Sequence, residues 1–164
     1  MPHFAWSKTP VAESSIKATY LYKISQFTTW PESAFNKDDN TFKIAIISDE
    51  PISSVFKKME TKQVRGRNIV VEQFDEGKIP KDLAKFQAVY LHDIKASRLA
   101  AINQSIQDLP ILTFSDADKL TDSPTLVTFV RQKSKMRFAI NSGQADRIGI
   151  KFNSQLLRIA LTAK

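Results

Sequence analysis

Apolar residues recur at helical spacing near the start of the chain. Within residues 14–31 they form one apolar stripe, made of Ile16, Ala18, Tyr20, Leu21, Ile24 and Phe27. Ser14 suits the N-cap of such a helix, and Pro31 favours an end at Trp30, because a residue before proline is disfavoured in the α region. The pattern predicts an amphipathic helix that packs through this stripe. Tyr22 lies off the stripe and is expected on the surface, and Trp30 is expected to close one end of a sheet.

Short apolar runs, each typical of a buried strand, follow this helix. The runs are residues 42–47, 69–74, 86–91 and 110–114. A helical pattern follows the first run after Pro51, and another follows the third run after Asp93. Between the first helical pattern and the second run, the segment around Gly66 is expected to form a turn. Strands that alternate with helices predict a mostly parallel sheet with right-handed crossovers.

The last third of the chain has a different pattern. Residues 125–130 and 136–140 are typical of a hairpin whose tip is 131–135. Asn141 fits the N-cap of a short helix that ends at Gly149, and Asn153 or Ser154 fits the cap of a final helix. We therefore predict an α/β fold: a three-layer α-β-α sandwich with a mostly parallel sheet and an antiparallel C-terminal hairpin.

The length of 164 residues suits one domain. Pro2 and Pro10 lie in a stretch without periodicity, so residues 1–12 are predicted to be a flexible N-terminal arm and residues 13–164 a single domain. No run approaches the roughly 20 apolar residues of a membrane span. Residues 1–8 have neither the basic nor the apolar region of a signal peptide, which leaves open a cytosolic protein or a signal peptide absent from this sequence.

Composition excludes several chemistries. The chain has no cysteine, so disulfides, thiolate zinc sites and cysteine catalysis are excluded, and a zinc site would need both histidines plus carboxylates. No complete set of a nucleophile, a base and a substrate-positioning group is recognisable. We therefore predict that the chain is not an enzyme and needs no metal and no cofactor.

The net charge of +7 comes from the last fifth of the chain. Residues 1–130 hold 16 basic and 16 acidic side chains, whereas residues 131–164 hold eight basic side chains and one acidic one, Asp146. Such a segment suits an acidic partner or an anionic membrane surface, or it is simply a solvated face. Nucleic acid is not expected, because no aromatic platform or recognition helix accompanies the charge.

Acidic residues stand next to the ends of three predicted strands. Asp49, Asp93 and Asp116 could meet at the carboxyl edge of the sheet and bind Mg²⁺ or another small ligand, or they could cap the helices that follow. His92 beside Asp93 could serve as a base or a pH sensor. The predicted ligand pocket is therefore Asp49, His92, Asp93 and Asp116.

Four segments resemble, in order, the YfiR family of small exported bacterial proteins. They are 17–31, the strand 42–47 followed by Asp49-Glu50-Pro51, the turn 64–67, and the closing hairpin and helix within 130–161. The resemblance spans about residues 14–161. Two features depart from the family: the segment 121–125 lacks the glycines often found before the hairpin, and the paired cysteines of some members are absent.

The resemblance implies a periplasmic, often dimeric protein with a three-layer α/β fold and no enzymatic activity. Its best-known members repress a membrane-bound diguanylate cyclase by contacting the cyclase's periplasmic domain, which lowers cyclic di-GMP signalling and biofilm formation; related domains occur next to sensor kinases. For this chain we expect a partner of that kind and possible self-association as a homodimer. The expected contact residues are Arg131, Lys135, Arg137, Asn141 and Arg147. The alternative function is a small-ligand or metal-sensing module that uses the acidic strand-end pocket.

Overall fold

The computed structural model describes residues 10–117 and 124–161, and within them the main sheet has seven strands in the order β3-β4-β2-β5-β6-β7-β8. The strands are β2 (Thr41–Ile47), β3 (Gln63–Val64), β4 (Arg67–Phe74), β5 (Ala88–Leu91), β6 (Leu112–Ala117), β7 (Val127–Gln132) and β8 (Lys135–Ile140). Neighbouring strands from β4 to β7 are parallel, and the edge strands β3 and β8 are antiparallel to their neighbours.

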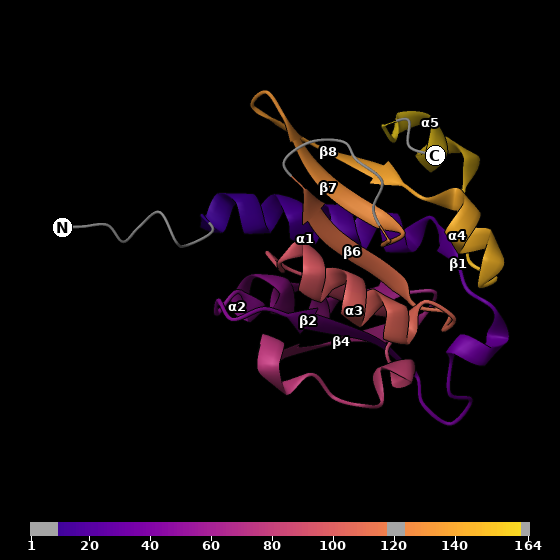
Figure 1. Cartoon of the computed structure of the whole chain (residues 1–164). Coiled ribbons are helices and arrows are strands. Elements are labelled where there is room, and N and C mark those ends of the chain that lie inside the picture. The colour runs from indigo at the N-terminus through magenta and orange to yellow at the C-terminus, as the bar shows by residue number, and fades with distance from the viewer. Residues whose placement is uncertain (1–9, 118–123, 162–164) are drawn as a thin grey trace.

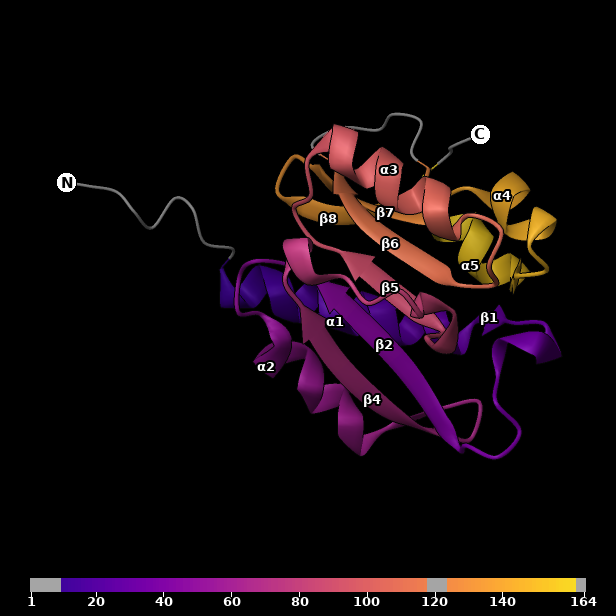
Figure 2. The ribbon, with the colours of Figure 1, turned by 60° about the horizontal axis from the view of Figure 1, so that its bottom comes forward.

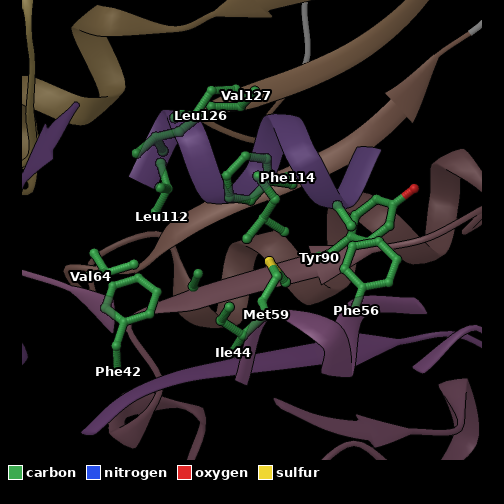
Figure 3. Packing of buried hydrophobic residues seen from close by; sticks show 14 of the residues in the cluster. Phe42, Ile44, Phe56, Met59, Val64, Tyr90, Leu112, Phe114, Leu126 and Val127 are labelled. Atoms are coloured by element: carbon green, nitrogen blue, oxygen red, sulfur yellow. The ribbon is translucent and has the colours of Figure 1, made fainter. Parts of the chain in front are cut away.

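Helices cover both faces of this sheet (Figures 1 and 2). On one face lie α1 (Val11–Gln26), α2 (Ser53–Phe56) and the 3₁₀ segment η3 (Lys57–Thr61), while α3 (Ala96–Ile106) covers the other. Alternate residues of β2 face opposite sides: Ile44 and Ile46 pack under α1, and Ala45 and Ile47 pack under α3. The α1 side holds the larger apolar cluster, seen in Figure 3. The predicted three-layer α/β sandwich, with its mostly parallel sheet and antiparallel hairpin, is confirmed.

Smaller elements complete the described chain. These are β1 (Thr28–Thr29), η2 (Glu32–Ala34), η4 (Glu76–Lys78), η5 (Leu83–Lys85), α4 (Ser142–Arg147), β9 (Lys151–Phe152) and α5 (Ser154–Ile159). Strands β1 and β9 pair antiparallel as a separate two-stranded sheet. This pairing joins the exit of α1 to the C-terminal part of the chain.

Helix α1 differs from the prediction in its bounds and in its buried face. Pro10 occupies the N-cap position and Ser14 lies inside the helix, so the predicted Ser14 cap is wrong. The helix ends at Gln26, before the predicted end, because Thr28 leaves the helix to pair with Phe152. The buried face consists of Ser14, Lys17, Ala18, Leu21, Ile24 and Ser25. Two residues of the predicted stripe, Ile16 and Phe27, are 47% and 41% exposed.

Trp30 is buried at the amino end of the parallel strands, as expected. Its indole Nε1 donates a hydrogen bond of 3.1 Å to the carbonyl oxygen of Gln87, and its ring meets Phe35 and Phe42 edge to face. A buried indole that has both a hydrogen-bond partner and aromatic neighbours stabilises this end of the core.

The closing hairpin is confirmed, with a tighter turn than predicted. Strands β7 and β8 extend to Gln132 and Lys135, so the turn is Lys133-Ser134, and Lys133 adopts a left-handed φ of 59°. Asn141 caps α4, because its Oδ1 accepts a 3.1 Å hydrogen bond from the Gln144 backbone nitrogen. Gly149 ends this region with a φ of 82°, which favours glycine. Asn153 caps α5 through a 2.8 Å bond from Gln155 N, which settles the choice between Asn153 and Ser154.

Candidate functional site at the strand ends and the closing hairpin

The carboxyl ends of the parallel strands meet where the strand order changes direction. Strand β2 lies between β4 and β5, so the chain crosses to one side of β2 and then returns to the other. In open α/β sheets such a switch point is the usual place for a ligand. Ser48 and His92 directly follow β2 and β5 there, and Asp116 lies near the end of β6.

A buried lysine from α1 organises the charges at this edge. The side chain of Lys17 is 6% exposed, and its Nζ lies 2.7 Å from Asp116 Oδ1 and 3.1 Å from Glu13 Oε2. The other carboxylate oxygen of Glu13 pairs with Arg131 of β7. A buried charge is tolerated only when it is paired, and Lys17 has two carboxylate partners. The ion pairs therefore connect α1, β6 and the hairpin in one network.

Asp116 also receives two uncharged donors. The hydroxyl of Tyr90 donates to its carboxylate at 2.9 Å, and the backbone N–H of Asp93 donates at 3.1 Å. Burial, followed by the charge of Asp116, raises the pKa of Tyr90 well above its usual value, so the hydroxyl remains a donor. Asp93 has a left-handed φ of 52°, and the bond to Asp116 stabilises that uncommon conformation.

His92 is buried beside these groups. Its Nδ1 lies 2.9 Å from Ser48 Oγ, which also accepts a hydrogen bond from Glu50 N, and its ring meets Tyr90 edge to face. Burial lowers the pKa of His92, and the positive charge of Lys17 lowers it further while Asp116 opposes the shift. Ser48 and His92 are 1% and 3% exposed. This serine–histidine contact is therefore a packing contact, since no substrate can reach the hydroxyl.

The predicted ligand pocket is only partly assembled. The backbone N–H of Asp93 donates to Asp116, and the ring of His92 contacts Tyr90, which also donates to Asp116. Asp49 lies apart from them and accepts a 2.8 Å hydrogen bond from Glu76 N at the start of η4. Across residues 10–117 and 124–161, no three His, Asp or Glu side chains are grouped so that they could hold a metal ion. The expected helix caps are also wrong, because neither α2 nor α3 has a side-chain cap.

A polar cavity of about 320 Å³ lies over the charged network. Its lining residues are Glu13, Lys17, Asp116, Ala117, Phe129, Arg131, Lys133 and Met136. Local patterns do not single out Lys17 or Glu13, because Asp116, the second partner of Lys17, and Arg131, the second partner of Glu13, lie far away along the chain. One signal in the sequence could have revealed the burial of Lys17. The residues Ser14, Lys17, Ala18, Leu21 and Ile24 recur at helical spacing and so form a second possible buried face of the helix.

The predicted partner-binding residues separate into two groups. Lys135 and Arg131 are exposed near the turn of the hairpin, with Lys133 between them. Arg137 follows on β8, where its Nη2 donates a 3.3 Å hydrogen bond to the Ile159 carbonyl of α5. We define the hairpin tip as Arg131, Lys133 and Lys135. These three basic side chains lie at the same end of the hairpin, with Arg131 and Lys135 on opposite faces of it, because Arg131 pairs with Met136 and Lys135 pairs with Gln132.

Asn141 and Arg147 lie at the opposite end of the hairpin, near α4 (Figure 1). Asn141 is six positions after Lys135, which corresponds to about 20 Å of strand. Arg147 is held against the end of α3, where its Nη1 lies 2.7 Å from Asp108 Oδ1 and its Nη2 donates to the Gln107 carbonyl at 3.0 Å. The five predicted contact residues therefore lie in two groups, one towards each end of the hairpin.

The fold is an α/β module whose strand-end cluster, including Ser48 and His92, is buried. The family model described as YfiR/HmsC-like matches residues 14–161, and the chain belongs to this family. Membership indicates a regulatory protein of cyclic di-GMP signalling. The family is periplasmic, and its members are not known as enzymes. In residues 10–117 and 124–161, no helix is long and apolar enough to cross a bilayer.

Other comparisons add little. None of the curated proteins matches the chain. Among solved structures, cystalysin from Treponema denticola, which contains a pyridoxal 5'-phosphate cofactor, is similar with a TM-score of 0.39 and 12% identity. The similarity covers 93% of this chain, which spans 55% of the length of that chain. A likeness at this level supports no conclusion about cofactor or activity.

Proposed function

We propose that the chain is a periplasmic regulator that binds the sensory domain of an inner-membrane diguanylate cyclase and represses it. Binding favours the inactive state of the cyclase, and a signal that weakens binding releases it. Membership of the YfiR/HmsC-like family is the observation that carries this proposal. Repression would lower cyclic di-GMP and with it biofilm formation. The alternative partner is the periplasmic domain of a sensor kinase. The proposal also includes self-association of this chain as a homodimer.

The hairpin tip is the proposed contact surface. Arg131, Lys133 and Lys135 are exposed there, and the part of the chain that holds them carries the net positive charge. Complementary charge accelerates the encounter with an acidic surface and disfavours basic partners. We assign Asn141 and Arg147 to the α4 end of the hairpin, where one caps a helix and the other is tied to α3.

Charge reversal tests the surface. The variant Lys133→Glu/Lys135→Glu changes the tip but keeps Arg131, whose ion pair with Glu13 belongs to the internal network. The matched control, Lys37→Glu/Lys81→Glu, makes the same charge change at exposed residues of two loops away from the hairpin.

We expect the tip variant to bind the purified periplasmic domain of the cyclase about tenfold more weakly than the control at low salt. The difference should shrink as the salt concentration rises, because salt screens exposed charges. Equal affinities of the two variants at low salt would remove the hairpin tip from the interface. Light scattering of the free protein tests the homodimer independently.

A small-ligand sensor is the second candidate function, favoured by the cavity over the Lys17–Asp116 pair. A ligand there would compete for Glu13, Asp116 or Arg131 and so alter the link between α1 and the hairpin. Calorimetric titration with Mg²⁺ and with small anions tests it. The absence of heat with all of them would count against this function.

A further inference from the structure

A second hollow lies on the α1 face of the molecule, between α1 and the α2–η3 segment, and has no role in the function proposed above. Its volume is about 360 Å³. The lining residues, which we call the α1–η3 groove, are Ser15, Ala18, Thr19, Tyr22, Lys23, Val55, Lys58, Met59 and Lys62. The volume is at the lower end of the range of small-molecule sites, about 300–1,000 Å³.

The floor of the α1–η3 groove is apolar and reaches the core. Ala18 and Met59 are buried members of the large apolar cluster, and Tyr22 and Val55 pack against that cluster while half exposed. Figure 3 shows Met59 among the core side chains. Methionine adapts its shape to a bound group more readily than branched residues do. An apolar ligand body in this groove would thus contact the core directly.

The rim of the groove carries one sign of charge. Lys23, Lys58 and Lys62 are exposed, and none of the described residues that line the groove is acidic. The ammonium of Lys62 lies over the Tyr22 ring, 5.4 Å from its centroid. Lysine places a point charge on a flexible apolar stem, which suits a single anionic group without fixed geometry.

We propose that the α1–η3 groove binds a small apolar carboxylate, with its hydrocarbon part on Ala18, Tyr22, Val55 and Met59 and its carboxylate among the three lysines. The charge of the rim selects an anion, and the apolar floor selects a hydrocarbon body. The size of the groove favours a free small molecule over a segment of another protein. This site is separate from the hairpin tip and from the cavity over Lys17.

Decanoate, kept below its micellar concentration, is the probe. We expect it to shift the NMR signals of Tyr22, Val55 and Met59 in the whole protein. Lys58→Glu/Lys62→Glu should weaken its affinity about tenfold, as the loss of two exposed ion pairs predicts, whereas Lys37→Glu/Lys81→Glu should leave it unchanged. Val55→Glu, which places a competing carboxylate in the groove, should also weaken binding. Thermal melting of each variant separates loss of binding from loss of folding.

The cationic analogue decyltrimethylammonium tests the charge selection. We expect no shift of the groove signals with this compound. Equal binding of the two amphiphiles, or unchanged decanoate affinity in Lys58→Glu/Lys62→Glu, would overturn the proposal. Shifts confined to residues outside the groove would overturn it as well.

Discussion

Replacing Lys17 by methionine tests the buried ion network at the strand ends. The substitution keeps the length of the side chain and removes its charge, so Asp116 loses the ammonium that lies 2.7 Å away. Removing one partner of a buried ion pair costs about 3–5 kcal/mol. The cost here should be lower, because the Asp116 side chain is 21% exposed and keeps its bonds from Tyr90 and Asp93. We expect Lys17→Met to lower the free energy of unfolding by about 2–3 kcal/mol.

A double-mutant cycle with Asp116→Asn isolates the pair. Because the double variant has no unpaired charge at residue 116, its destabilisation should be smaller than the sum of the two single effects by about 1.5–3 kcal/mol. Urea denaturation measures each variant, and thermal melting should show a fall of roughly 2–4 °C for each kcal/mol lost. The solvent-screened pair of Lys43 and Asp39 is the control, and its coupling should be clearly smaller than that of Lys17 and Asp116. Effects of Lys17→Met and Asp116→Asn that add within about 0.5 kcal/mol would refute the network.

Two further predictions concern stability. The pKa of His92 is lowered from 6.5, so the unfolded chain binds more protons than the folded protein just below that pH. The contribution of His92 to stability should therefore be full above about pH 6.5 and should fall as the pH drops towards the lowered pKa. His92→Gln should flatten this pH dependence, which urea titrations at pH 7.5 and 5.5 measure. If both proteins show the same pH dependence, His92 is not the responsible group. Asn141→Ala should cost about 1 kcal/mol through the lost α4 cap and leave partner affinity unchanged; weaker partner binding at unchanged stability would restore Asn141 to the interface.

Local patterns were sufficient for most of the fold. The run 42–47 is continuous and apolar, and it forms a central strand buried on both faces. Asn141 and Gly149 were recognisable as the start and end signals of a helix, because capping and positive φ depend on a few neighbouring residues. The hairpin was found for the same reason, and the length of its turn was the detail missed.

Long-range pairing explains what the sequence did not reveal. The burial of Lys17 was not predicted, because it depends on Asp116 of β6, which lies beside it in the fold and far from it along the chain. Lys17 lies on the buried face of α1, and its neighbour Ile16, which belonged to the predicted stripe, faces solvent. The contact of Arg147 with Asp108, at the end of α3, was not predicted either, because it depends on how α4 packs. Such contacts depend on topology, which local patterns do not specify.

Repression of the cyclase is the central claim, and its activity in a membrane is the most direct measurement. A full-length membrane diguanylate cyclase of the kind proposed as the partner would be reconstituted in vesicles with its sensory domain outside and GTP inside. The account predicts that adding this protein outside lowers the rate of cyclic di-GMP formation, and that Lys133→Glu/Lys135→Glu requires about tenfold more protein for the same effect while Lys37→Glu/Lys81→Glu does not. An unchanged rate at saturating wild-type protein would contradict it.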